Sequence, residues 1–172
     1  MTTLNPLSSL DPARLARLEL LIVDCDGVMT DGRVWLDASG RETKAFSVID
    51  GHGLWMLRED GVRLGMITRD RSGIPAVRAR KLQFDIIHTA IDHKGACVRA
   101  MLSEQGLDAD VVGYMGDDIP DLEAFAEVGL RVAPASARPE VLRAADAVTD
   151  ASGGHGAVRE LCDAVLAARR GA

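Results

Sequence analysis

The stretch Leu20-Leu21-Ile22-Val23-Asp24-Cys25-Asp26-Gly27 decides the fold of this 172-residue chain. Its four consecutive apolar residues end at an acidic residue, which is typical of a short strand covered on both faces of a sheet. Similar apolar runs recur along the chain. They predict further strands over residues 62–68, 84–88, 111–115 and 130–133, with a weaker strand over 145–149.

Helical patterns lie between most of these strands. They predict helices over residues 12–18, 53–59, 74–82, 94–105, 120–128, 139–143 and 157–168. Alternating strands and helices imply right-handed crossovers, so we expect an α/β fold with a Rossmann-like, doubly wound parallel sheet. Residues 32–46 break the alternation, because β-type residues flank the turn signal Ser39-Gly40. We predict a small β-hairpin inserted after the first strand.

Length and composition narrow the class of protein. With 172 residues and 47% hydrophobic content, the chain is expected to form a single domain over 1–172. A net charge of −6 without a basic stripe argues against a nucleic-acid partner. No apolar run reaches the roughly 18 residues of a membrane span, and the opening residues do not resemble a signal peptide. Three widely spaced cysteines match neither a disulfide framework nor a zinc site, so we expect a cytoplasmic protein.

Polar residues that follow the predicted strands form a set with matched chemistry. Asp24 and Asp26 end the first strand, Thr68 ends the second, Lys94 begins a helix after the third, and Asp117 follows the fourth. The carboxyl ends of parallel strands meet at one edge of a sheet, where ligands bind. Asp24 is predicted to attack phosphorus while Asp26 serves as general acid and base. Thr68 and Lys94 are predicted to bind phosphate.

The acidic cluster after the fourth strand suits a hard cation with oxygen ligands, such as Mg²⁺. Taken singly, each of these motifs also has a structural explanation. An Asp-x-Asp-Gly stretch is often a turn, and an Asp-Asp pair is usually a helix cap or a solvated loop. The functional interpretation depends on the order of the whole set, which unrelated loops do not predict.

The ordered set resembles the four motifs of the haloacid dehalogenase superfamily of phosphohydrolases. The matching segments are Asp24-Cys25-Asp26-Gly27-Val28 with Thr30-Asp31-Gly32, then Thr68, Lys94 and Gly116-Asp117-Asp118-x-x-Asp121. Two further segments resemble the 3-deoxy-D-manno-octulosonate 8-phosphate phosphatase group within it. They are Phe46-Ser47-Val48-Ile49-Asp50-Gly51-His52-Gly53 and Gly153-Gly154-His155-Gly156-Ala157-Val158-Arg159-Glu160. The resemblance covers about residues 18 to 168.

This resemblance implies a Mg²⁺-dependent phosphatase without a large cap domain, acting on a phosphorylated sugar acid in lipopolysaccharide biosynthesis. The implied substrate is 3-deoxy-octulosonate 8-phosphate or a related nonulosonate 9-phosphate. The implied metal ligands are the Asp24 carboxylate, the Asp26 carbonyl and Asp117, with Asp118 and Asp121 supporting the metal shell. The group forms homotetramers, in which hairpins pack together and a neighbouring subunit helps close each active site.

One segment departs from the group's usual Thr-Gly-Arg motif, because this chain has Thr68-Arg69-Asp70-Arg71. A residue other than glycine after the threonine is expected to change the shape of the phosphate loop. Asp70 and Arg71 are candidate substrate contacts, since Arg71 can pair with a substrate carboxylate. A solvated surface run is the alternative. The histidines His52 and His155 are further candidate contacts.

Two alternative functions remain open on the sequence. A phospho-acceptor receiver domain also gathers acidic residues, threonine and lysine around Mg²⁺, but it has its paired acids before a separate acceptor aspartate. Here the pair Asp24 and Asp26 comes first and the acidic cluster comes late. The other alternative is a non-catalytic or regulatory domain of the same fold, associated with a sugar-acid cytidylyltransferase.

Overall fold

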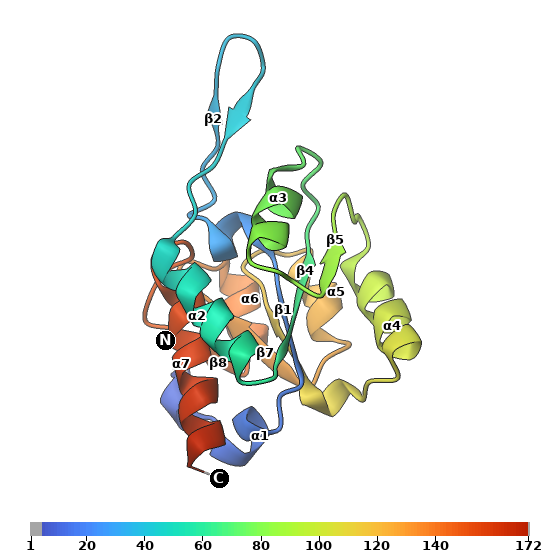
Figure 1. Ribbon diagram of the computed structural model, residues 1–172, viewed down its shortest axis with the longest axis vertical. Helices are drawn as coiled ribbons and strands as arrows, with labels where there is room; N and C mark the ends of the chain where they lie inside the picture. The colour runs from blue at the N-terminus through green and yellow to red at the C-terminus, as the bar shows by residue number, and fades with distance from the viewer. Residues whose placement is uncertain (1–4, 172) are drawn as a thin grey trace.

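A six-stranded parallel sheet forms the centre of the computed structural model, which describes residues 5–171 (Figure 1). Its strands are β1 (Leu20–Val23), β4 (Arg63–Ile67), β5 (Ile86–His88), β6 (Val112–Met115), β7 (Leu130–Ala133) and β8 (Ala147–Val148). They lie in the order β5-β4-β1-β6-β7-β8. The chain winds outward on one side of β1 and then on the other, which confirms the doubly wound prediction. Val23 pairs with both Met66 and Met115, so three strands end level with one another.

Helices cover both faces of this sheet. One face is covered by α1 (Pro12–Ala16), α2 (Val48–Glu59) and α7 (Ala157–Arg170), and the other by α4 (Lys94–Gln105), α5 (Asp121–Phe125) and α6 (Pro139–Ala144). The helix α3 (Ile74–Lys81) lies beside β5. Leu21 and Val23 belong to the first core, while Leu20 and Ile22 belong to the second. Side chains alternate between the faces of a strand, so a strand with two covered faces must be apolar throughout.

The expected hairpin is present and projects beyond the carboxyl edge of the sheet (Figure 1). Its strands β2 (Trp35–Leu36) and β3 (Glu42–Thr43) pair antiparallel over only two residues each. The Asp37 side chain accepts hydrogen bonds from the backbone N–H groups of Ser39 and Arg41 and so closes the turn. The prediction of a hairpin is confirmed, although most of the segment is extended chain outside the ladder.

The start of α2 differs from the prediction, because the helix begins at Val48 and not near residue 53. The Asp50-Gly51-His52 segment, which precedes the predicted helix, is therefore helical. Ser47 caps the helix by accepting a hydrogen bond from the backbone N–H of Asp50. The Asp50 carboxylate is buried and accepts hydrogen bonds from the backbone N–H groups of Gly156 and Arg159, at the start of α7. This contact joins segments more than 100 positions apart, so the local sequence pattern did not reveal it.

Several other elements are shorter than predicted, and α5 and β8 are examples. The helix α5 ends at Phe125, where residues up to 128 were expected, and β8 contains two residues where five were expected. No helix within residues 5–171 combines the length and the apolar character needed to cross a membrane.

Candidate active site

The carboxyl ends of β1, β4 and β6 meet at the point where the winding of the sheet reverses. A pocket of about 510 Å³ lies there. It brings together nine residues that the sequence singled out: Asp24, Asp26, Thr68, Asp70, Arg71, Lys94, Asp117, Asp118 and Asp121. The strand-end rule therefore located the pocket from the sequence, because parallel strands end at a common edge.

Lys94 is the first residue of α4 and is buried between two carboxylates. Its Nζ lies 2.9 Å from Asp24 Oδ1 and 2.6 Å from Asp121 Oδ1. Burial alone lowers the pKa of Lys94, but the charges of Asp24 and Asp121 outweigh it and raise that pKa, which keeps the ammonium charged. Burial raises the pKa of Asp24 to about 6, against the opposing effect of Lys94. Asp24 is therefore mostly ionised at neutral pH, as an attacking carboxylate must be.

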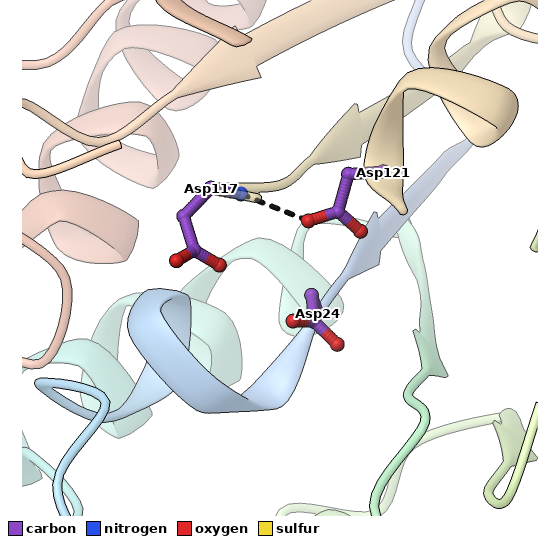
Figure 2. Close-up of side chains that lie close together, drawn as sticks. All are labelled: Asp24, Asp117 and Asp121. Atoms are coloured by element: carbon purple, nitrogen blue, oxygen red, sulfur yellow. Dashed lines mark hydrogen bonds between the residues drawn. The ribbon is translucent and has the colours of Figure 1, made fainter. Parts of the chain in front are cut away.

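Asp121 holds the acidic loop in place with both of its carboxylate oxygens. Oδ1 accepts hydrogen bonds from Lys94 and from the hydroxyl of Tyr114 at 2.8 Å. Oδ2 accepts from the backbone N–H groups of Asp117 at 3.0 Å and Asp118 at 3.1 Å, and Figure 2 shows the first of these bonds. Asp121 is fully buried, and its four partners leave little capacity for a metal. This geometry is compatible with the supporting role expected for Asp121.

Asp117 has unused hydrogen-bonding capacity. Among the described residues its buried Oδ1 has no hydrogen-bond partner, and it faces Asp24 across the site (Figure 2). Carboxylate oxygens of Asp24, Asp117 and Asp121 lie within 4.8 Å of one another. Burial, assisted by the charges of Asp24, Asp121 and Asp118, raises the pKa of Asp117 to about 8. Crowded, buried carboxylate oxygens of this kind fit a hard divalent cation.

Gly27 makes this close approach possible. Its φ of +87° lies in the left-handed region, and a Cβ added there would lie 2.0 Å from Asp117 Oδ2. A side chain at this position would therefore separate the loop after β1 from the loop after β6. The sequence identified Gly27 as a source of a tight turn, and the structure adds the packing reason.

Thr68 is buried beside the two acidic loops. Its Oγ1 accepts a hydrogen bond from the backbone N–H of Asp70 at 3.2 Å. A hydroxyl that already accepts in this way keeps its own hydrogen free to donate, which suits a phosphoryl oxygen.

Asp26 is not part of the cluster of three aspartates and instead contacts two residues to which the sequence assigned no role. Lys44, in the chain leaving the hairpin, places its Nζ 2.7 Å from each carboxylate oxygen of Asp26. The Thr30 hydroxyl lies 3.5 Å from Asp26 Oδ1. Lys44 was missed because a lysine within a hairpin has no periodic or motif signal. The one signal in the sequence was the scarcity of lysine, because the chain contains only three.

The remaining candidate contacts lie further out. Arg71 is exposed at the rim of the pocket and pairs with Asp92 at 2.8 Å. His52 is exposed on α2 and stacks on Trp55, with ring centroids 5.4 Å apart. His155 is exposed in the turn before α7. Neither histidine lines the pocket of this chain.

Comparisons with known proteins agree with this geometry. A family model described as haloacid dehalogenase-like hydrolase matches residues 69–161. A 3-deoxy-D-manno-octulosonate 8-phosphate phosphatase of Yersinia pestis is 38% identical over 156 residues, which cover 91% of this chain and 83% of that protein. This chain belongs to the haloacid dehalogenase-like hydrolases, in the family of these phosphatases. The resemblance found in the sequence is confirmed, and the receiver-domain alternative loses its support.

Solved structures show the same similarity to this family. A hypothetical protein of Xanthomonas campestris has a TM-score of 0.90 and 41% identity, covering 98% of this chain and 94% of that one. A 3-deoxy-D-manno-octulosonate 8-phosphate phosphatase of Moraxella catarrhalis, solved in complex with a magnesium ion, a phosphate ion and a KDO molecule, has a TM-score of 0.89 and 33% identity. That match covers 92% of this chain and 91% of the other.

Proposed function

We propose that this chain is a Mg²⁺-dependent phosphatase that hydrolyses a sugar-acid phosphate monoester, either 3-deoxy-octulosonate 8-phosphate or a related nonulosonate 9-phosphate. The observation that supports this most is the pairing of Asp24 with Lys94 beside the unpartnered carboxylate oxygen of Asp117. The arrangement offers a nucleophile, a phosphate anchor and a cation ligand within one pocket. The names of the relatives in Yersinia pestis and Moraxella catarrhalis support the substrate class.

The proposed reaction has two balanced steps. First, an Asp24 oxygen attacks phosphorus and the bond to the ester oxygen breaks, leaving its electron pair on that oxygen. Asp26 gives its proton to this oxygen, so the sugar leaves as an alcohol and Asp24 becomes an aspartyl phosphate. Water then loses a proton to Asp26 and attacks phosphorus, which breaks the bond to Asp24 and releases inorganic phosphate.

The other residues bind and orient the phosphoryl group in this scheme. Lys94 neutralises charge on its oxygens, and Thr68 donates a hydrogen bond to one of them. Mg²⁺ would be held by the carboxylates of Asp24 and Asp117 and by the Asp26 carbonyl, where it supplies positive charge to the phosphoryl oxygens. Asp118 and Asp121 would support this shell from behind.

Substrate carboxylate recognition is assigned to the rim of the pocket. Arg69 and Arg71 are both exposed there and lie near the single carboxylate of Asp92, at 3.7 Å and 2.8 Å. Two guanidinium groups against one acid leave positive charge for a sugar-acid carboxylate, which arginine binds in a two-pronged geometry.

We also propose that the chain acts as a homotetramer in the cytoplasm. Exposed apolar residues gather on the hairpin and at the start of α2, including Leu36 at 67% and Val48 at 81% exposure. Such a patch is typical of an association surface. Self-association here would also bring His52 toward a subunit contact. Light scattering should show that Leu36→Asp reduces the mass of the assembled protein. Ala100→Asp, on the exposed surface of α4, should leave that mass unchanged. Equal masses for Leu36→Asp and the unmodified protein would contradict the proposal.

The test of function is release of inorganic phosphate in the presence of Mg²⁺. A panel of octulosonate and nonulosonate phosphates is compared with ordinary hexose phosphates. We expect the sugar-acid phosphates to be preferred and Asp24→Asn to abolish turnover, while Asp110→Asn, an exposed aspartate outside the pocket, retains it. Preference for hexose phosphates would refute the substrate class, and full activity of Asp24→Asn would refute the nucleophile.

A further inference from the structure

Lys44 connects the hairpin to the pocket through two ion pairs. Its Nζ lies 2.7 Å from both Oδ1 and Oδ2 of Asp26 and also contacts Oδ2 of Asp70. The side chain is only 1% exposed, although Lys44 follows directly after the exposed strand β3. A lysine that leaves an exposed hairpin and buries its ammonium against two carboxylates is an uncommon arrangement, because burial of a charge is unfavourable without close partners.

The three contacts account for the whole donor capacity of the ammonium. A lysine has three N–H groups, of which two are directed to Asp26 and one to Asp70. No donor is left for a substrate. The effect of Lys44 must therefore pass through the carboxylates that it holds.

Asp70 is itself held from its other side. Its Oδ1 accepts hydrogen bonds at 2.6 Å from both the backbone N–H and the hydroxyl of Ser72. Asp70 thus acts as a fixed anchor, Lys44 spans the gap, and Asp26 is bound at the far end by both of its oxygens. This accounts for an acidic residue two positions after Thr68, in the segment where the sequence departs from the usual motif.

We propose that Lys44 is a positioning residue for the general acid and base Asp26, with Asp70 as its anchor. The proposal rests on the proposed phosphatase function and deepens it. Binding through both oxygens fixes the plane of the Asp26 carboxyl group, and proton transfer depends on the distance between that group and the leaving oxygen. The hairpin thereby contributes a residue on which the chemistry depends, while its strands remain outside the pocket.

The experiment compares two leaving groups in the same variants. An alkyl phosphate, such as 3-deoxy-octulosonate 8-phosphate, needs a proton on the departing oxygen, whereas the aryl ester p-nitrophenyl phosphate leaves as a stable phenolate. We expect Lys44→Met to lower kcat/KM for the alkyl substrate about 10²-fold, the loss typical of a misplacement of about 1 Å. The quantity compared is kcat/KM because it reports the step in which the leaving group departs, whereas hydrolysis of the aspartyl phosphate is common to both esters. The aryl substrate should lose less than about 3-fold, and Lys44→Arg should recover most of the alkyl activity, because arginine also binds a carboxylate through two N–H groups.

Two further variants complete the comparison. Lys81→Met makes the same substitution at an exposed lysine at the end of α3, and both substrates should be unaffected. Asp70→Asn keeps the shape of the anchor but removes its charge, so it should shift selectivity in the same direction as Lys44→Met by a smaller factor. A purely structural role for Lys44 predicts equal losses on both esters, and that result, or unchanged alkyl turnover, would overturn the proposal.

A crystal structure of Lys44→Met separates this proposal from the proposed function. We expect the Asp26 carboxyl group to adopt a different rotamer from that of the unmodified protein. An Asp26 in its original place would overturn the positioning role whether or not the chain hydrolyses any phosphate. Conversely, absence of phosphate release by the unmodified protein would count against the phosphatase function alone, with the Asp26 rotamer still deciding the role of Lys44.

Discussion

Replacement of Asp117 by asparagine should stabilise the metal-free protein at alkaline pH. Asp117 is held among Asp24, Asp118 and Asp121, and burial with these charges raises its pKa from 3.8 to about 8. A carboxyl group whose pKa is raised on folding binds protons more tightly in the folded state. Its contribution to stability is complete below the unfolded pKa and is lost as the pH rises through the folded pKa. The contribution of Asp117 to stability is therefore lost between about pH 4 and about pH 8.

The size of the effect follows from the same shift. Each pKa unit corresponds to about 1.4 kcal/mol. The rise in the pKa of Asp117 from 3.8 to about 8 therefore limits the change in the free energy of unfolding to about 6 kcal/mol. Asp117 is partly exposed, so solvent screening leaves an effect on the order of 2–3 kcal/mol. Asparagine has the same shape and no charge. Asp117→Asn should thus nearly match the unmodified protein at about pH 4 and exceed it by about 2–3 kcal/mol at about pH 8.5.

Urea unfolding followed by circular dichroism, with a chelator present, measures this difference at both pH values. Asp110→Asn is the matched control, because Asp110 is exposed and lies outside the pocket. Addition of Mg²⁺ at 1,000 times its Kd should reverse the order, since such binding stabilises a protein by about 4.1 kcal/mol and Asp117→Asn removes a proposed ligand. An equal gain at both pH values, or no gain at the higher one, would refute the reasoning.

Three further predictions concern the support of the site. A Cβ at Gly153 would lie 1.8 Å from a backbone carbonyl of the loop after β1, so Gly153→Ala should cost about 1–3 kcal/mol and lower kcat about 10²-fold. Gly171→Ala, whose Cβ would meet its nearest atom at 3.5 Å, is the control, and equal unfolding midpoints would contradict the clash. Asp50→Ala should lower the free energy of unfolding by about 0.5–2 kcal/mol, because Asp50 caps α7. Asp50→Asn should restore part of this stability. An unchanged thermal unfolding midpoint of Asp50→Ala would exclude the capping role. Tyr114→Phe removes a hydrogen bond to Asp121, which should cost about 1.5–3 kcal/mol in denaturant unfolding; a neutral effect would show that the bond contributes little.

Much of the fold and the pocket was predictable from the sequence. The apolar run before Asp24 indicated a central strand, and the helix over residues 94–105 matches α4 at both ends. Thr68, Lys94 and Asp117 were located because each lies within a few residues of a strand end, and parallel strands end at one edge. The short distance along the chain between a strand and its polar residue keeps this inference reliable.

Other features depend on contacts between distant segments. The helical start of α2 was missed, since Asp50 and Gly51 favour a loop locally and are held in the helix by packing and by the bond from Asp50 to α7. The bridge from Asp26 through Lys44 to Asp70 was missed for the same reason. Its three members come from a strand end, a hairpin and a second strand end.

The sequence by itself determined the order of strands and helices and the single sheet edge that gathers the polar residues, among them Asp24, Lys94 and Asp117. These follow from side-chain periodicity and from the types of residue at each strand end. Only the tertiary structure decided that the Asp121 carboxylate accepts hydrogen bonds from Lys94, Tyr114 and the loop backbone. It also decided that Asp26 is held by a lysine 18 positions away. Those partners depend on the path of the folded chain in space, because a buried charge is stabilised by whichever groups surround it.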